Sequence, residues 1–336
     1  MTSAARLVEV HRLAVVGREA GIAGDVGRRV CRVWLGRSRF ADVIRLAEQT
    51  LTLGEDATAI YHLGWAKQVT GFPMEALAAY DRALVLYRAS RNRWNEAATL
   101  NNIGLVHDGL GDRQLALEYY EQALPIRREV GDRAGEAVTL NNIGLVSNGL
   151  GDRQQALDYF RQVLPIQREV GDRVGEATTL NNIGSVHNGL GDHQQALDYY
   201  GQALPIRREV GDRVGEAATL NNIGLVYDGL GDQQQALNYY WQALPIVREI
   251  GDRAERGDHA VQPRGDLPPA GPARPDRRRA GAGGGAGPAG KPPRPGGRHR
   301  HAGTRTPGTG RIVTSTARLV EVHRLAVVEP RRRGRA

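Results

Sequence analysis

Residues 101–111 read NNIGLVHDGLG, and close copies of this stretch recur at residues 141–151, 181–191 and 221–231. Neighbouring copies are always forty positions apart. Self-similarity at a fixed period of this size is typical of chains built from stacked copies of one structural unit. The sequence therefore predicts an array of repeats, for which chain length is a poor guide to the number of domains.

The pattern of apolar residues in each unit predicts two α-helices joined by a short turn. In the first helix, Leu100, Ile103, His107 and Leu110 fall on one helical face, and Gly111 follows as the helix end. The second helix carries a matching apolar face, which consists of Ala116, Leu117, Tyr120, Ala123, Leu124, Ile126 and Val130.

Two local features of the unit need a physical reason. Glycine inside a helix costs roughly 1 kcal/mol relative to alanine, so Gly104 predicts a close approach of the second helix through its small residues Ala116 and Ala123. At the start of the second helix, Asp is followed three positions later by Gln, which predicts a capping box. The pairs are Asp152 with Gln155, Asp192 with Gln195 and Asp232 with Gln235.

The pattern N-x-x-G-x-x-x-x-x-L-G-D, followed by A-L and then Y-Y-x-x-A-L, resembles the tetratricopeptide repeat. Its forty-residue period is similar to that of the kinesin-light-chain-like subgroup of bacterial proteins. The resemblance covers residues 56–252, which hold five units, four of them closely similar, and it implies an all-α, right-handed superhelical solenoid of stacked antiparallel helix pairs. The units depart from the common pattern at one aromatic position of the first helix, which holds His107, Ser147, His187 or Tyr227.

Residues 1–55 predict irregular helices that cap the array, because the first unit of a stack must cover an otherwise exposed apolar face. An amphipathic helix is expected over residues 6–16, and a helix pair within residues 30–53. Between them the helical pattern is interrupted by Gly21, Gly24 and Gly27.

The net charge of +8 is unevenly distributed along the chain. Residues 91–250 hold 14 basic and 21 acidic side chains, a net charge of −7. Residues 251–336 hold 19 basic and 7 acidic side chains, a net charge of +12. The repeats are therefore acidic, and binding of nucleic acid is expected only through the basic tail and without sequence specificity.

The single cysteine, Cys31, excludes a disulfide within the chain and any multi-cysteine metal site. No apolar run approaches the length of a membrane-spanning helix. Residues 7–16 are too interrupted by charged side chains to form a good signal peptide. We expect a cytoplasmic protein without a membrane partner.

Residues 253–313 form a tail of a different composition. Residues 257–311 contain 14 Gly and 10 Pro, a content that predicts disorder. Residues 255–283 can also be back-translated and read one nucleotide later as a further repeat-like helix pair. An out-of-frame continuation of the array is therefore an alternative origin of this tail.

Residues 314–336 begin with a near copy of the amino terminus and end in a basic segment. Residues 314–328 differ from residues 2–16 only at Thr316, which stands where the first copy has Ala4. One interpretation is a second capping or docking helix. The other is a scar of recombination or gene assembly.

The candidate site is a second, polar stripe on the first helix of each unit. Asn101, Leu105 and Asp108 lie on one face, and Asn102 lies beside them. In the tetratricopeptide family the first helices line the concave groove, so the resemblance implies that these residues face a ligand. Asn102 and its equivalents could instead bridge to the neighbouring helix. The equivalent positions hold Asn141, Asn142, Leu145 and Asn148; Asn181, Asn182, Ser185 and Asn188; and Asn221, Asn222, Leu225 and Asp228.

A column of asparagines favours an extended peptide, because each amide offers both a donor and an acceptor to a peptide backbone. Asp108 and Asp228, on an acidic array, favour a basic or neutral peptide over an acidic one. Arg127 and Arg128 are expected on a solvated outer face, where they pair with Glu129 and its equivalents.

No catalytic, cofactor or metal site is predicted. Residues 285–292 read GAGPAGKP, which lacks the Ser or Thr that ends a phosphate-binding loop. His107 and His187 lie two units apart, too far to share a metal ion if the units stack. They are expected to fill the interior of the helix pairs.

These observations favour a non-enzymatic scaffold that binds a protein or an extended peptide. One alternative is a detached carboxy-terminal sensor segment of a larger bacterial signalling NTPase, which such arrays often accompany. Another is a truncated or frameshifted product with no independent role. In that case the apolar face exposed after Ile250 would lead to end-to-end self-association.

Overall fold

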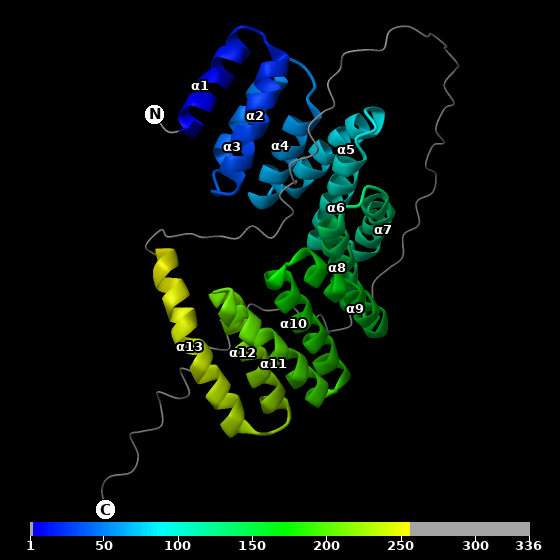
Figure 1. Cartoon of the computed structure of the whole chain (residues 1–336), viewed down its shortest axis with the longest axis vertical. Helices are drawn as coiled ribbons and strands as arrows, with labels where there is room; N and C mark the ends of the chain where they lie inside the picture. The colour runs from blue at the N-terminus through cyan, green and yellow to red at the C-terminus, as the bar shows by residue number, and fades with distance from the viewer. Residues whose placement is uncertain (1–2, 256–336) are drawn as a thin grey trace, which may run out of the picture. The chain divides into compact units, whose positions relative to one another are not determined.

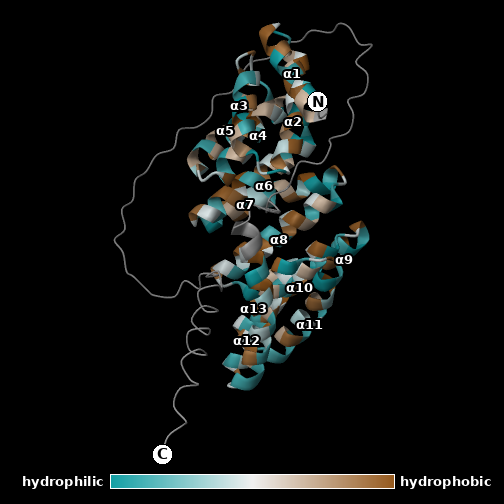
Figure 2. Cartoon of the chain, turned by 90° about the vertical axis from the view of Figure 1, so that its left-hand side faces the viewer, coloured by the Kyte–Doolittle hydropathy of each residue, from teal (hydrophilic) through white to brown (hydrophobic). Residues whose placement is uncertain are grey.

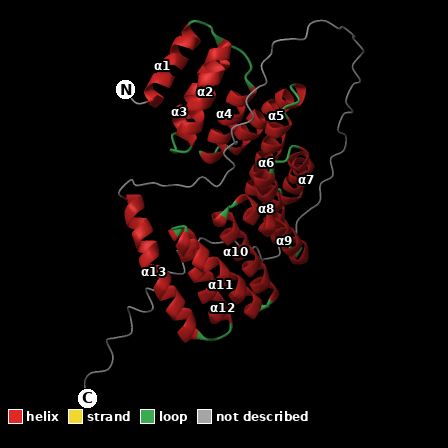
Figure 3. Cartoon of the chain, viewed as in Figure 1, coloured by secondary structure: helices red, strands yellow, loops and turns green. Residues whose placement is uncertain are grey.

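The computed structural model describes residues 3–255 of the 336-residue chain, and within them it contains thirteen α-helices and no β-strand (Figures 1 and 3). The tail was expected to begin at residue 253, but α13 continues to Glu255. The rest of the expected tail, residues 256–313, and the expected second amino-terminal-like helix, residues 314–336, lie outside the described range. The helices are α1 (Ser3–Val16), α2 (Ala20–Leu35), α3 (Phe40–Leu51), α4 (Ala57–Val69), α5 (Pro73–Ala89), α6 (Arg93–Leu110), α7 (Arg113–Glu129), α8 (Arg133–Leu150), α9 (Arg153–Val170), α10 (Arg173–Leu190), α11 (His193–Glu209), α12 (Arg213–Gly229) and α13 (Gln233–Glu255).

Helices α4 to α13 form five pairs, as the forty-residue period predicts. Each helix packs against the next one along the chain, and the first helices of neighbouring pairs, such as α6 and α8, also contact each other. In Figure 2 each helix carries both polar and apolar colours, as expected where one face of every helix is buried. The all-α solenoid of stacked helix pairs is confirmed.

The interior of a pair is built from short aliphatic and aromatic side chains. Leu100, Ile103 and Val106 of α6 share a buried cluster with Ala123 and Ile126 of α7. Ala116 and Tyr120 of α7 belong to a second cluster, with Ile143 and Val146 of α8. The expectation that Leu110 belongs to this face was wrong, because its side chain is 43% exposed. The helix ends at Gly111, which adopts the left-handed conformation with φ +91°, so Leu110 lies in the last turn, beyond the contact with α7.

Gly104 does provide a close helix contact, but the residue it admits is an aromatic one. A Cβ placed on Gly104 would lie 2.6 Å from Cε1 of Tyr120. The same relationship holds for Gly144 with Phe160 and for Gly184 with Tyr200. The prediction named only Ala116 and Ala123 on the facing helix and did not include this ring, which fills the space that the missing side chain leaves.

Aspartate caps were predicted at the start of the second helix of each unit, but most of them lie at the start of the first helix. Asp132, Asp172 and Asp212 precede the first helices, and each accepts a hydrogen bond from a backbone N–H three residues later, at 2.8–3.0 Å. Before the second helices, Asp152 and Asp192 make no such bond. The Asp192 carboxylate lies 3.3 Å from Nδ1 of His187 instead. Among the three predicted boxes, only Asp232 caps its helix, through the N–H of Gln235.

The amino-terminal helices also differ from expectation at their glycines. Helix α2 continues through Gly21, Gly24 and Gly27 without interruption. A Cβ on Gly27 would lie 3.2 Å from Oγ1 of Thr50 and 3.4 Å from Cδ2 of His11. The gain from this close packing outweighs the low helix propensity of glycine.

None of the helices among residues 3–255 is long and apolar enough to cross a membrane.

Candidate functional site

The predicted polar residues form a partly exposed stripe on three successive first helices, which we call the amide stripe. Leu145 of α8 and Ser185 of α10 are exposed, and the asparagines on either side of them are half-buried. On α12, Leu225 is half-buried and Asp228 is exposed. The stripe consists of Asn141, Leu145 and Asn148 of α8; Asn181, Ser185 and Asn188 of α10; and Asn221, Leu225 and Asp228 of α12.

Helix α6 does not continue this exposed stripe as the sequence suggested. Asn101 and Asn102 are both 0% exposed. The Nδ2 group of Asn102 donates to the hydroxyl of Tyr61 at 2.8 Å, which lies in the more divergent preceding pair. Asn101 and Asn102 are therefore internal residues, and on α12 Asn221 is also buried.

Side-chain amides of neighbouring units are hydrogen-bonded to one another. Asn142 donates through Nδ2 to Oδ1 of Asn101 at 3.2 Å, Asn182 donates to Asn141 at 3.1 Å, and Asn222 donates to Asn181 at 3.1 Å. The second asparagine of each unit therefore bridges to the preceding first helix, which is the alternative that the sequence left open. We call this series the amide ladder.

The amide ladder determines which atoms of the first asparagines remain available. Their oxygens accept from the next unit, so their Nδ2 groups point away from it. Within residues 3–255, the Nδ2 groups of Asn141 and Asn181 donate no hydrogen bond. These half-buried donors can pair with carbonyl oxygens of a bound chain.

The charges around the stripe are acidic. Burial raises the pKa of Asp108, an effect that the nearby Arg113 guanidinium opposes, and Nε of Arg113 lies 4.0 Å from the carboxylate. No Lys or Arg belongs to the stripe itself. A cation does lie beside it, since Nη1 of Arg113 donates to the carbonyl oxygen of Gly149, the residue after Asn148, at 3.0 Å.

A network of ion pairs, which was not predicted from the sequence, joins neighbouring units. Buried Glu136 accepts from Arg128 at 2.7 Å and from Arg133 at 2.5 Å. Arg133 also pairs with Glu169 of the second helix at 2.8 Å. The pattern recurs around Glu96, Glu176 and Glu216. The signal was present in the sequence as an Arg and a Glu three positions apart at the start of α6, α8, α10 and α12.

Arg127 was expected on the solvated face but is buried. Its guanidinium bonds the carboxylate of Asp132, which is also buried. Arg207 and Asp212 repeat this pair, and Gln167 takes the arginine's place in the intervening unit. Arg128, by contrast, is exposed as predicted, but it pairs with Glu136 and not with Glu129, which pairs with Arg93.

The histidines of the first helices stack on tyrosines within their own pairs. His107 lies parallel to Tyr119 with 5.5 Å between ring centroids, and His187 stacks on Tyr199 in the same way. No cluster of three His, Cys, Asp or Glu side chains within residues 3–255 is arranged to hold a metal ion.

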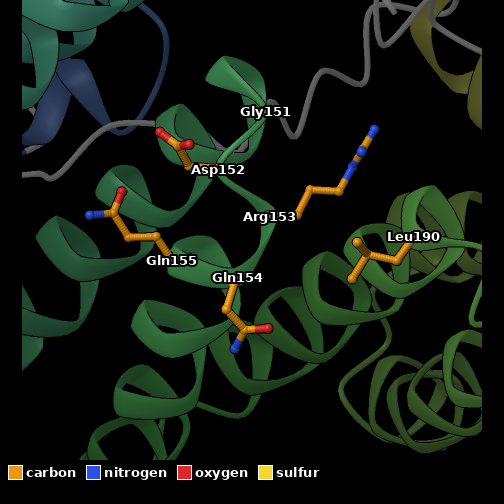
Figure 4. A pocket seen from close by; sticks show the side chains of 6 residues that line it. All are labelled: Gly151, Asp152, Arg153, Gln154, Gln155 and Leu190. Carbon is orange, nitrogen blue, oxygen red and sulfur yellow. The ribbon is translucent and has the colours of Figure 1, made fainter.

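An open pocket lies where the turn between α8 and α9 meets the end of α10 (Figure 4). In this view Arg153 and Leu190 lie on the same side of the pocket, whereas Gln154 and Gln155 point elsewhere. The pocket includes no residue of the amide stripe and brings together no nucleophile and base. Its lining residues are Gly151, Asp152, Arg153, Gln154, Gln155 and Leu190.

Stacked helix pairs with a repeated, partly exposed face define the class of helical-repeat proteins that act as protein-interaction scaffolds. The particular family follows from a direct match. The model of the tetratricopeptide repeat matches residues 55–129, 116–169, 135–209 and 175–249, so more than half of the chain is covered. The chain belongs to the tetratricopeptide repeat family.

Solved structures with the same fold include BtubC (BKLC) from P. vanneervenii, which is 21% identical, with 84% of this chain and 98% of that chain covered and a TM-score of 0.53. The Cut9–Hcn1 hetero-tetramer of APC/C is 18% identical, with 77% and 46% covered and a TM-score of 0.56. A signal-transduction ATPase with a tetratricopeptide repeat sensor from Pyrococcus horikoshii is 18% identical, with 70% and 36% covered and a TM-score of 0.56. No curated protein matches the sequence.

Proposed function

We propose that the array binds an extended segment of a partner protein along the amide stripe and has no catalytic activity of its own. The observation that carries this proposal is the pair of half-buried Nδ2 donors on Asn141 and Asn181, which the amide ladder orients away from the following unit. These donors recur at the same position of neighbouring units, so a chain lying across α8 and α10 can use both of them.

The energetics require apolar contacts as well as hydrogen bonds. A neutral hydrogen bond contributes about 0.5–1.5 kcal/mol net, whereas micromolar affinity requires about 8 kcal/mol. Leu145 and Leu225 stand on either side of Ser185 along the stripe, and their partly exposed side chains offer apolar surface to the ligand. A suitable segment therefore carries apolar side chains separated by polar ones.

The charge of the site favours a basic or neutral segment. Asp228 belongs to the stripe, Asp108 lies at the equivalent position of α6, and the surrounding repeats are acidic. An acidic partner would be repelled by these carboxylates. We further propose that the protein acts in the cytoplasm, where its single cysteine needs no disulfide partner.

A random peptide library, selected on the full-length chain, tests the proposal directly. Leu145→Lys should weaken binding of the selected peptides by at least about tenfold, which corresponds to about 1.4 kcal/mol. Leu115→Lys is the matched control, because Leu115 of α7 is 37% exposed and Leu145 is 39% exposed. Equal affinities of the two variants would place the binding surface elsewhere.

A sensor role within a larger signalling NTPase is the second candidate. The Pyrococcus horikoshii protein carries a tetratricopeptide repeat sensor of the same fold, which supports this candidate by fold alone. Its test is the genomic DNA: an NTPase domain encoded in frame with residue 1 would favour it. A repeat-like reading in the alternative frame of the tail would instead favour a frameshifted product.

A further inference from the structure

Helix α1 occupies a defined surface on α2 and α3, which we call the α1 seat. Nε2 of His11 lies 2.8 Å from Oγ1 of Thr50, and this contact is buried. Ala14 is buried beside it, and Leu7 and Val8 pack against the amino-terminal core. The seat therefore recognises one polar and three apolar side chains on a single face of a helix.

The same face is encoded a second time near the end of the chain. Residues 314–328 place Leu319, Val320, His323 and Ala326 where α1 has Leu7, Val8, His11 and Ala14. The four side chains described above are therefore identical in the two segments. The one difference is at Thr316, which corresponds to Ala4, outside the contacts described above.

The limits of the copy also coincide with the limits of the helix. Helix α1 ends at Val16, and the match ends at the equivalent residue, Val328. The residue that follows is Gly17 in the first segment and Glu329 in the second. The copied unit is thus the one helix that fits the seat, without the turn that joins it to α2.

We propose that residues 314–328 are a second occupant of the α1 seat, which takes the place of α1 when that helix leaves. Both segments would make the same contacts, so the difference between them is the connection to the array. Residues 17–19 join α1 directly to α2, whereas residues 256–313 separate the second segment from α13. The shorter connection favours α1 in the intact chain. An emptied seat is filled by the copy, either from the same chain or from a second one.

A matched pair of substitutions separates the two occupants. Arginine at the buried position 14 unseats α1, because a buried charge without a partner is costly. Arginine at position 326 disables the copy in the same way. The double variant Ala14→Arg/Ala326→Arg of the full-length chain should therefore present an empty seat, and circular dichroism should show that its repeats remain helical.

The probe is a fluorescent synthetic peptide with the sequence of residues 314–328. It should bind the double variant at least about tenfold more tightly than it binds the unmodified chain, in which α1 holds the seat. A peptide with the sequence of residues 2–16 should bind with closely similar affinity. The peptide carrying Ala326→Arg should not bind. Equal binding to both chains, or binding of the arginine peptide, would overturn the proposal.

A second measurement does not depend on the stability of the double variant. In a Cys31→Ala background, Thr50→Cys with His323→Cys should be joined by a short bismaleimide, and Ala14→Arg should increase the yield. Thr50→Cys with Arg324→Cys is the control, since the equivalent Arg12 is exposed and points away from the seat. A monomeric product indicates the chain's own segment, and a dimeric product indicates the segment of a second copy. Equal yields from His323→Cys and Arg324→Cys, or no product from either, would overturn the proposal.

Discussion

The ring of Tyr120 occupies the space in which the side chain of residue 104 would stand. A Cβ on Gly104 would lie 2.6 Å from Cε1 and 2.9 Å from Cδ1 of that ring. Because the ring is fully buried, it cannot turn away without opening a gap. The contact between the helices of each pair therefore depends on the absence of one methyl group.

Gly104→Ala should destabilise the array by about 1–3 kcal/mol, the usual cost of overpacking a core. Gly109→Ala is the control: it lies in the same helix with nothing within 4 Å of the added Cβ, so it should be neutral or stabilising by up to about 1 kcal/mol. Urea unfolding followed by circular dichroism measures both. Equal effects of the two substitutions would contradict the close approach of Tyr120.

The amide ladder predicts an asymmetry between its first and last members. Asn101→Ala leaves Nδ2 of Asn142 and Oγ1 of Thr139 without their acceptor and should cost about 1–3 kcal/mol. Asn221→Ala should cost less, because no further first helix within the described range donates to it. Comparison of the two unfolding midpoints checks this, and a larger cost at Asn221 would show that the ladder is not the source of stability.

Acidification should destabilise the amino-terminal part of the array through His62. Burial, together with the charges of Arg32 and Arg28, lowers the pKa of His62 to about 3. Between about pH 6.5 and pH 3 His62 is therefore protonated in the unfolded chain but neutral in the folded one. The free energy of unfolding is unaffected by His62 above about pH 6.5 and decreases as the pH falls towards about 3. The loss approaches about 1.4 kcal/mol per pH unit.

The matched variant is His62→Asn, since the equivalent position of the next unit holds Asn102. Urea unfolding at pH 7.5 and pH 5 should show a smaller pH dependence for this variant than for the unmodified chain. An unchanged pH dependence would assign the effect to other groups, such as His11, whose pKa burial also lowers.

Removal of one whole unit should leave a folded, shorter array. Deletion of residues 133–172 joins Asp132 to Arg173, which preserves the aspartate cap before Gly175 and brings Asn182 to the position from which Asn142 reaches Asn101. Each unit contacts only its neighbours, so the helical circular dichroism per residue of the array should be retained. Its loss would mean that distant units depend on each other.

The outer face of α13 should support self-association. Leu237 is 39% exposed, whereas the equivalent Leu157 is covered by the following unit and is 2% exposed. Sedimentation velocity at increasing concentration should show association that Leu237→Glu weakens. The same association in both chains would exclude this face as the contact.

The repeat period and the buried faces could be predicted from sequence because they depend on spacing alone. The identity of the side chain that fills a particular space could not be predicted in this way. Gly104 correctly indicated a close approach, but an aromatic ring and an alanine both suit the facing helix, and only the relative rotation of the helices decides between them. Likewise the two asparagines of each unit are adjacent in sequence and lie about 100° apart around the helix. This rotation places the second asparagine in the bridge to the preceding first helix and the first asparagine in the stripe.

The charged residues were the least predictable. Arg127 and Arg128 are adjacent and chemically identical, yet one is buried against Asp132 and the other is solvated. The local sequence gives no reason to choose between them. Both pair with a carboxylate at the start of the next pair, Arg127 with Asp132 and Arg128 with Glu136. The rotation of α7 against α8 therefore decides which of the two is buried.

The contacts between successive helix pairs are nearly identical in sequence, and this affects how the chain folds into the correct sequence of pairs. During folding, α8 and α10 offer α7 almost the same contact surface. The pair α10–α11 can therefore pack on α7 in place of α8–α9, which would leave α8–α9 unpacked. Such misaligned assemblies would be long-lived kinetic traps. Ser147, Phe160, Val163 and Gln167 distinguish the pair α8–α9 from its neighbours, and we expect these differences to favour the correct alignment.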